Sequence, residues 1–562
     1  MDQAKTPDTN RAADQLARVL ATLGADRMFC VPGESYLSFL DALLDQTAID
    51  TVVCRHEGGA GMMAVADAKL TGRPGLLAVS RGPGATNASI ALHLADQDAV
   101  PLVCLIGQVA RFERGRGAFQ EVDYTQMFGG IAKGVWEVTE GSKLAETVVR
   151  AWSLAQSGTP GPVVIALPED MLSDPVDGAL PAPVIVPRAG VSPDDLAQAA
   201  EMLAQAERPL IIAGSGLDSA QGRAALAELA RVHGVPVALT FKHQEIFDNG
   251  SPLYAGHLGF KSPAPLVKAL GQADLILAIG TRMGDTPSQG YKLPRAPRPD
   301  QPFIHVWPDA DVLGQVFETD LPLACDPALF CAALAGQPAK APAARADWAA
   351  QVNSVARQLT DVTPKDQEDG LDFGSVVVEL ARQVPRDNIV VTDSGNFSGW
   401  VHLFWPWDGT QQAVGAAGGA MGLGVPGAVA AALRNPDKTV LGFAGDGGLL
   451  MTGNEIATAM AKGAKPKIVV SDNRTYGTIR LHQERDHPNR VSGTDLVNPD
   501  FAAWGEAFGI KGFSVAKGDD IAAIVGAFLA HDGPAILSAK TSAQAISPHI
   551  TIAGIHARMA KA

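Results

Sequence analysis

The sequence has few cysteines, and none of them forms a CxxC pair. Most lie in apolar runs of strand type, and the five are Cys30, Cys54, Cys104, Cys325 and Cys331. This placement predicts reduced residues of the core rather than metal ligands or a catalytic thiol. The sequence also lacks a zinc-ligand spacing and a GxxxxGK[ST] phosphate loop.

Long apolar runs and basic clusters are missing as well. Gly and Pro interrupt each apolar run before it reaches the length that spans a membrane. The N-terminal segment MDQAKTPDTNRAADQ is polar and has no apolar core, so we expect no signal peptide and a cytoplasmic location. The formal net charge is −15. These features predict a soluble acidic enzyme that binds neither membranes nor nucleic acid.

Short Val, Ile and Leu runs alternate with helical segments along the whole chain, which is the pattern of parallel strands joined by crossover helices. The candidate strands begin at Arg27, Thr51, Leu76, Pro101 and Pro162, then at Pro209, Pro236, Asp274 and Pro302, and finally at Asn388, Thr439, Lys467 and Pro534.

Two proline-rich linkers, which begin at Pro175 and Ala335, divide this pattern into three parts. We therefore predict an α/β protein of three tandem, doubly wound domains with parallel sheets. The predicted bounds are 1–175, 190–336 and 365–545, followed by a C-terminal tail, 546–562.

The segment from Thr439 to Gly477 carries the most specific pattern. A strand runs into the sequence GDGG, a helix is expected from about Asn454 to Lys462, and a second strand ends at Asn473. Because such crossovers return the chain parallel, Asp446 and Asn473 are expected at the carboxyl ends of adjacent strands. A carboxylate and an amide oxygen suit Mg²⁺, which water and phosphate oxygens complete.

The glycines of this segment have a matching role. Gly445, Gly447 and Gly448 are expected to allow close backbone approach and to turn with positive φ, so that backbone amides face a diphosphate. Thr475 can add a backbone carbonyl as a metal ligand. The alternative is an ordinary strand-to-helix turn, in which Asp446 is a capping residue and Asn473 a turn residue.

GDG followed by an asparagine after such a unit resembles the signature of thiamine diphosphate enzymes. The resemblance implies that Asp446, Asn473 and the Thr475 carbonyl bind the metal that holds the cofactor diphosphate. Asp472 replaces the first of the two asparagines that are usual in the family.

Thiamine chemistry also needs a carboxyl group that activates the aminopyrimidine ring. Glu57, in RHEGGAGMMAVADA, resembles the activating glutamate of the family. The alternative is a residue of the first helical turn that the helix dipole stabilises.

Further segments resemble the large subunits of acetolactate synthases and their relatives. These are RHEGGAGMMAVADA, SRGPGATNASIALHLADQDAVPLVCLIGQV, GRGAFQEVD and GGAMGLGVPGAVAAAL. The likeness covers nearly the whole chain in order. It implies pyrimidine, central and diphosphate domains, and a homodimer or homotetramer in which Glu57 of one subunit meets the cofactor of another.

The same resemblance assigns roles to single residues. Phe119 and Gln120 are implied near the reacting substrate, and Met421 is implied to support the bent cofactor. The residues implied to bind the cofactor are Gly33, Gly395, Asn396, Gly419, Met421, Gly445, Gly447, Gly448, Tyr476 and Gly477.

Several positions depart from the acetolactate synthase pattern. Glu34 replaces a glycine near the thiazolium, and Thr478 and His482 replace the methionine and tryptophan that shape the acceptor pocket. Arg480, Arg114 and Arg116 can bind a substrate carboxylate, and the alternative is that these loop arginines are solvated surface residues. We therefore predict a substrate pocket that contains Glu34, Thr478, Arg480 and His482 and that differs from the usual one.

Flavin is not favoured as a cofactor. In the middle domain, Ser219 replaces the third glycine of the dinucleotide fingerprint that begins at Gly214, and the segments GHLGFK, GTRMGD and HVWPD are also altered. The expected cofactors are thiamine diphosphate and Mg²⁺.

These observations predict a carboligase or decarboxylase that acts on a 2-keto acid and passes the acyl group to a carbonyl acceptor, as acetolactate synthases do. The alternatives are a decarboxylase or 2-hydroxyacyl lyase without acetolactate synthesis, a flavin-linked oxidase, and a nucleotide-binding oxidoreductase or binding module in which GDG and Glu57 are coincidences. Fold resemblance leaves donor, acceptor, pathway and regulatory subunit open.

Overall fold

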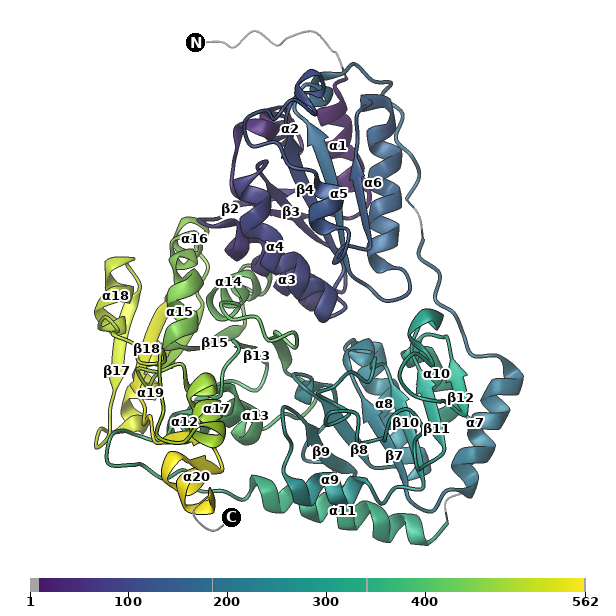
Figure 1. Cartoon of the computed structure of the whole chain (residues 1–562), viewed down its shortest axis with the longest axis vertical. Coiled ribbons are helices and arrows are strands. Elements are labelled where there is room, and N and C mark those ends of the chain that lie inside the picture. Colours follow the sequence, from purple (N-terminus) through teal and green to yellow (C-terminus); the bar gives the residue numbers. More distant parts are fainter. Residues whose placement is uncertain (1–9, 184, 340–341, 560–562) are drawn as a thin grey trace. The chain divides into compact units, whose positions relative to one another are not determined.

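The computed structural model describes residues 10–183, 185–339 and 342–559. The chain divides into two compact units. One lies within residues 1–186, 389–398 and 414–543, and the other within 187–388, 399–413 and 544–562. The first unit contains a first and a third sheet, and the second unit contains a central sheet (Figure 1).

The first sheet has six strands in the order β2-β1-β3-β4-β6-β5. The strands are β1 (Arg27–Cys30), β2 (Asp50–Val53), β3 (Gly75–Val79), β4 (Leu102–Gln108), β5 (Gly134–Glu137) and β6 (Pro162–Pro168). Its helices are α1 (Ala12–Thr22), α2 (Leu37–Asp45), α3 (Glu57–Thr71), α4 (Pro83–Gln97), α5 (Tyr124–Phe128) and α6 (Gly141–Gln156), with the 3₁₀ turns η1 (Glu34–Tyr36), η2 (Arg111–Glu113) and η3 (Met171–Ser173).

The central sheet has the order β12-β11-β10-β7-β8-β9. The strands are β7 (Pro209–Ala213), β8 (Val237–Thr240), β9 (Tyr254–Leu258), β10 (Leu275–Ile279), β11 (Phe303–Val306) and β12 (Leu321–Leu323). The helices are α7 (Pro193–Gln205), α8 (Ala220–His233), α9 (Ala264–Leu270), α10 (Pro327–Ala335) and α11 (Ala344–Thr360), with η4 (Ser215–Leu217), η5 (Gln244–Ile246) and η6 (Ala310–Val312).

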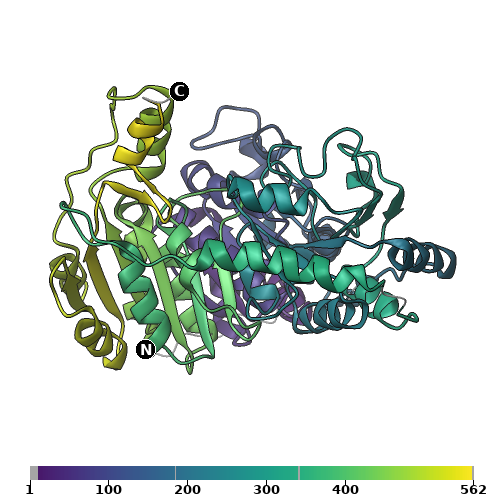
Figure 2. The same ribbon diagram turned by 90° about the horizontal axis from the view of Figure 1, so that it is seen from below.

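The third sheet has the order β14-β13-β15-β16-β18-β17, and Figure 2 shows its strands side by side. The strands are β13 (Asn388–Thr392), β14 (Gln412–Gly415), β15 (Thr439–Gly445), β16 (Lys467–Asp472), β17 (Lys511–Val515) and β18 (Ala535–Lys540). The helices of this part are α12 (Phe373–Gln383), α13 (Ser398–Phe404), α14 (Gly424–Arg434), α15 (Asp446–Thr452), α16 (Ile456–Lys462), α17 (Gly477–Asp486), α18 (Phe501–Ala507) and α19 (Ile521–Ala530), with η7 (Gly453–Glu455). A hairpin of β19 (Ala545–Ser547) and β20 (Ile550–Thr551) precedes α20 (Ile552–Met559).

Helices cover both faces of the sheets, because the central strands are buried on each side. On the first sheet, α1 and α6 contribute to one apolar core, whereas α3 and α4 contribute to another (Figure 1). The second of these cores continues into α14 and α16, which cover the third sheet. The predicted α/β architecture of three doubly wound parallel sheets is confirmed, and the domain bounds stay a prediction.

Strand order locates where ligands bind in such sheets. The first and third sheets share one topology, and their order reverses between β1 and β3 and between β13 and β15. Open α/β sheets bind ligands beyond the carboxyl ends of the strands at this switch point. The segments after these four strands hold Gly33, Ser80, Asp393 and Asp446.

Two details differ from the sequence analysis. The helix expected from about Asn454 begins at Asp446 and is divided into α15, η7 and α16 before Gly463 ends it with φ +69°. In the three six-stranded sheets, five strands were not predicted, namely β5, β9, β12, β14 and β17, and each lies at the edge of its sheet. The hairpin strands β19 and β20 were not predicted either. All five cysteines are free and buried, as predicted. Within the described ranges, no helix is both long and apolar enough to cross a membrane.

Candidate active site

Asp446 lies at the end of β15, and Asn473 follows the adjacent parallel strand β16, as the sequence predicts. Asp446 is only 3% exposed. Its carboxylate accepts hydrogen bonds from the Gly447 amide (2.9 Å) and from Asn498 Nδ2 (2.8 Å). Burial raises the pKa of Asp446 to about 6, although these hydrogen bonds and one from the Arg474 backbone oppose the shift.

The Asn473–Thr475 loop is tightly bent beside this carboxylate. Asn473 Oδ1 accepts a hydrogen bond from the Thr475 amide (3.1 Å), and Arg474 has a left-handed φ of +55°. The Thr475 hydroxyl donates to the Thr494 carbonyl (3.1 Å). Asn473 is thus a turn residue, and its position after β16 also suits the predicted ligand role.

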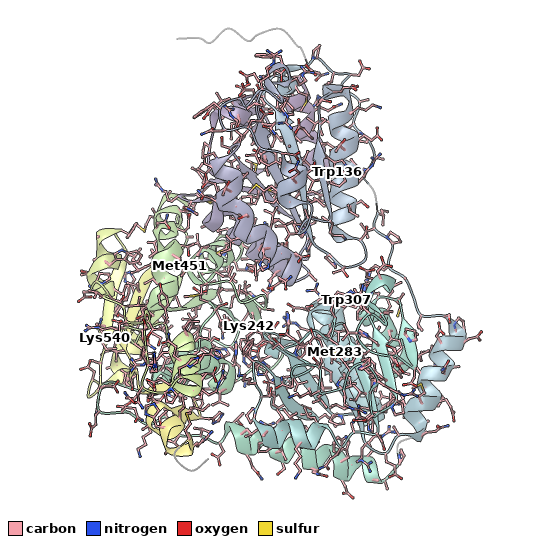
Figure 3. The ribbon with its side chains drawn as sticks, in the orientation of Figure 1. Trp136, Lys242, Met283, Trp307, Met451 and Lys540 are labelled. Atoms are coloured by element: carbon pink, nitrogen blue, oxygen red, sulfur yellow. The ribbon has the colours of Figure 1, made fainter. Side chains whose placement is uncertain are left out.

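Asn498 is a residue of this site that the sequence analysis missed. Its Nδ2 donates both to Asp446 Oδ2 and to Asp472 Oδ1, each at 2.8 Å. Asp472 in turn pairs with Lys540 Nζ at 2.6 Å, and Figure 3 labels Lys540 at the end of β18. Asn498 therefore ties the two strand-end carboxylates together, although no local pattern marks it.

The glycines of GDGG are needed for close approach and not for positive φ, which corrects the expectation. None of Gly445, Gly447 and Gly448 has positive φ. A Cβ at Gly447 would lie 2.4 Å from the Tyr476 ring, and one at Gly448 would lie 2.6 Å from Asp393 Oδ2. A Cβ at Gly445 would lie 3.1 Å from the Phe397 ring. The side chains that approach these glycines come from the segments after β13 and β16.

Asn396 and Thr478 lie together at the switch point of the third sheet. The Asn396 amide donates to Thr478 Oγ1 (3.1 Å), and this hydroxyl donates to Asn396 Oδ1 (3.0 Å). The preceding Gly395 has a φ of +152°. A predicted cofactor residue therefore contacts a predicted pocket residue.

The loop that carries Gly419 and Met421 is held from two sides. Asp98, in the first domain, accepts hydrogen bonds from the Gly418 amide (2.7 Å) and the Ala417 amide (3.1 Å). Asp393 accepts a hydrogen bond from the Gly422 amide (2.8 Å). Gly419 has a φ of +76° and no atom within 4 Å of an added Cβ, so backbone conformation is the reason for glycine at this position.

Glu57 begins α3 after strand β2, and its side chain is half-buried. Its Oε2 accepts a hydrogen bond from Asn87 Nδ2 (2.9 Å). No described residue donates to Oε1, which lies beside Gly84 at the start of α4. Asn87 is thus the described residue that holds the Glu57 carboxylate, through Oε2 alone.

Gly33, Glu34 and Gln120 gather around the residues after β3. A Cβ at Gly33 would lie 2.5 Å from Ser80, and the carboxylate of Glu34 lies 3.4 Å from Arg81 Nη2. Gln120 has a left-handed φ of +64° and packs against Gly82. Strained residues of this kind concentrate at functional sites.

The remaining predicted residues differ in how they are held. Phe119 is 75% exposed. His482 contacts Arg485 Nη2 through Nδ1 (2.8 Å). Arg480 lies 3.7 Å from the buried carboxylate of Glu484, which compensates its charge. Gly477 begins α17, and the ring of Tyr476, the residue before it, packs on Gly447.

The donor set fits a hard divalent cation. A buried carboxylate with a raised pKa, an amide oxygen and a backbone carbonyl lie at the ends of two adjacent strands. A cation there would offset the cost of burying the Asp446 charge.

Three family models match the chain in order. The N-terminal thiamine pyrophosphate (thiamine diphosphate) binding domain matches residues 10–127, the central domain of the same enzymes matches 196–334, and the C-terminal thiamine pyrophosphate binding domain matches 393–539.

Curated relatives match almost the full length. The chain is 30% identical to acetolactate synthase isozyme 2 large subunit of Escherichia coli over 93% of this chain and 94% of that protein. It is 29% identical to the large subunit of Corynebacterium glutamicum over 92% and 84%, and 31% identical to that of Parasynechococcus marenigrum over 91% and 84%. The chain therefore belongs to the thiamine diphosphate-dependent enzymes of the acetolactate synthase large-subunit family.

Proposed function

We propose that this enzyme decarboxylates a 2-keto acid and transfers the remaining acyl group to a carbonyl acceptor. The observation that carries the proposal is the buried Asp446 at the end of β15 beside the Asn473–Thr475 loop at the end of β16. Its position in a chain of this family supports a Mg²⁺ site made by Asp446, Asn473 and the Thr475 carbonyl.

Thiamine diphosphate, when bound, supplies the nucleophilic carbon and the electron sink of the reaction. Glu57 is the proposed proton donor and acceptor, because Asn87 holds its Oε2 while Oε1 accepts no hydrogen bond from the described chain. Gly395, Asn396, Gly447 and Gly448 are the proposed diphosphate contacts. Gly419 and Met421 are the proposed pyrimidine contacts, and Gly33, Gly445, Tyr476 and Gly477 complete the cofactor site.

We propose a homodimer or homotetramer in which Glu57 of one subunit serves the cofactor of another. The half-buried Glu57 side chain, with its unused Oε1, supports this arrangement. The cytoplasmic location stays a prediction. So do the roles of Phe119 and Gln120 near the substrate.

The acceptor pocket is proposed to differ from that of acetolactate synthases. The Thr478 hydroxyl donates a hydrogen bond to Asn396, and His482 contacts Arg485. The guanidinium of Arg81 lies 3.4 Å from the carboxylate of Glu34. These contacts support a decarboxylase or 2-hydroxyacyl lyase as the second candidate function, because a pocket lined by other groups accepts other substrates.

A flavin is not proposed. The central sheet has the strand order of dinucleotide-binding folds, but Ser219, at the third glycine position, caps α8 by accepting a hydrogen bond from the Gly222 amide (3.0 Å). A flavin-linked oxidase would give a yellow protein that consumes oxygen.

The test is to incubate the enzyme with thiamine diphosphate, Mg²⁺ and a panel of 2-keto acids, each with and without an added aldehyde, and to identify the products by mass. Acetolactate from pyruvate alone supports synthase activity, whereas an aldehyde product supports a decarboxylase. Glu57→Gln is expected to lower turnover at least about 100-fold. Glu146→Gln, on the exposed side of α6, is the matched control.

A further inference from the structure

The central domain holds three metal-ligating side chains outside the proposed active site. Asp218 follows β7 through η4, and His243 and Glu245 follow β8. One ring nitrogen of His243 and one carboxylate oxygen each of Asp218 and Glu245 lie within 4.8 Å of one another. The sequence analysis did not bring these residues together.

Glu245 is buried without hydrogen-bond partners. It is 1% exposed, and neither carboxylate oxygen has a partner among the described residues. His243 Nδ1 lies 3.6 Å from Glu245 Oε1 and is likewise buried without a hydrogen-bond partner. Buried carboxylates are almost always hydrogen-bonded or bound to a metal, because burial of a bare charge is strongly unfavourable.

The neighbouring cation does not satisfy Glu245. Arg223 binds Asp218 Oδ1 through Nη2 (2.6 Å) and Nε (3.2 Å), and its Nη1 donates to the Gln411 carbonyl (2.6 Å). Because a metal-binding imidazole is neutral, two carboxylates and one guanidinium would leave one negative charge for a bound cation to offset. Arg223 thus has the position of a group that orients a metal-binding carboxylate from outside.

The location is also one where α/β sheets bind ligands. β7 and β8 are adjacent and parallel, and β7 borders the switch point of the central sheet, where the order reverses between β7 and β10. The three side chains follow the carboxyl ends of these strands.

We propose that Asp218, His243 and Glu245 bind a divalent cation of the zinc or manganese class. An imidazole nitrogen with two carboxylate oxygens suits these ions better than Mg²⁺ or Ca²⁺, which favour oxygen ligands alone. Three protein ligands leave a coordination position for water or an anionic ligand. The site is separate from the proposed Mg²⁺ site and does not depend on the proposed function.

The experiment uses Zn²⁺ alone as the probe. The full-length protein is stripped with a chelator, supplied with Mg²⁺ and thiamine diphosphate, and dialysed against Zn²⁺, and the bound metal is then measured. We expect about one Zn²⁺ per chain. Glu245→Gln and His243→Gln are each expected to weaken Zn²⁺ binding more than about tenfold, because each removes a ligand. Glu228→Gln, on exposed α8, is the matched control.

To distinguish Zn²⁺ binding at the two metal sites, the dialysis is repeated without thiamine diphosphate and with Asp446→Asn. Zn²⁺ binding that persists in both, and that weakens in the Glu245 and His243 variants, supports the proposal even if the enzyme has no 2-keto acid activity. Equal Zn²⁺ binding in wild type and both variants overturns it, as does the absence of bound Zn²⁺ or its loss only in Asp446→Asn. His243→Gln keeps the test decisive if Glu245→Gln does not fold.

Discussion

The carboxylate of Glu455 holds the backbone that leads into Glu57. Its Oε1 accepts hydrogen bonds from the amides of Arg55 (3.0 Å) and His56 (2.9 Å), and its Oε2 accepts one from the Thr458 hydroxyl (2.6 Å). Glu455 is fully buried in η7, nine positions after Asp446. Asp98 of the first domain holds the Gly418 loop in return, so each domain positions a predicted cofactor segment of the other.

Replacement of Glu455 by alanine is expected to lower the free energy of unfolding by about 2–4 kcal/mol, because it leaves buried donors without an acceptor. Glu455→Gln is expected to cost about 1 kcal/mol, because the amide oxygen still accepts a hydrogen bond. Urea denaturation measures both values.

The control for these variants is Glu506→Ala, since Glu506 is an exposed residue of the same domain that pairs with Lys511. Gly59→Ala tests the same contact without changing Glu455, because its new Cβ would lie 2.5 Å from Glu455 Oε1. Wild-type stability in Glu455→Ala would show that these hydrogen bonds do not form in solution.

Asn498 is expected to support metal binding from outside the ligand set. Its amide group bridges Asp446 and Asp472, so Asn498→Ala frees Asp446 to move and removes the donor that lies between the two carboxylates. The affinity for thiamine diphosphate at fixed Mg²⁺ is expected to fall about 10–100-fold. Fluorescence titration gives the affinity, and Asn435→Ala, between the end of α14 and the start of β15, is expected to bind normally. An unchanged affinity in Asn498→Ala would argue against a metal at Asp446.

Lys467 at the start of β16 predicts a pH dependence of stability. Burial lowers its pKa to about 8 from the ordinary value of 10.5, while Nζ donates to the Gly533 carbonyl (2.9 Å). Between these two pH values the unfolded chain holds a proton that the folded chain has lost, so this residue makes the free energy of unfolding rise with pH. Across this interval, wild type is expected to gain about 3 kcal/mol relative to Lys467→Met.

Denaturation at several pH values above 7 measures this difference. Lys465→Met, at a half-exposed position nearby, is the control and is expected to show no comparable gain. A constant difference between wild type and Lys467→Met would contradict the shifted pKa.

Strands could be predicted from the sequence where burial on both faces requires a continuous run of apolar residues. Central strands such as β15 and β16 are covered on both faces, so their inner residues, 440–444 and 468–470, are apolar or glycine. The five strands of the six-stranded sheets that the sequence analysis did not predict are all edge strands. β17 (Lys511–Val515) has exposed positions and β12 has only three residues, so neither produces such a run.

The candidate site likewise has contacts that local sequence patterns predict and contacts that they do not predict. Asp446 and Asn473 belong to one strand–helix–strand unit, and their adjacency follows from local rules. Glu455 contacts a backbone 400 positions away, and Asp98 contacts one 320 positions away. A single sequence carries no sign of such long-range pairs, and Asp218, His243 and Glu245 meet for the same reason only in the folded chain.

Mixing two inactive variants tests whether the proposed active sites lie between subunits. Glu57→Gln and Asp446→Ala are each expected to be inactive alone. If Glu57 of one subunit serves the cofactor of the other, a mixed dimer has one site with both wild-type residues and one site with neither. Random exchange of subunits should then restore about a quarter of wild-type activity, because half of the dimers are mixed. Activity is measured after co-refolding of the two proteins, and no recovery despite mass-spectrometric detection of mixed dimers would place Glu57 and Asp446 at the same site of one chain.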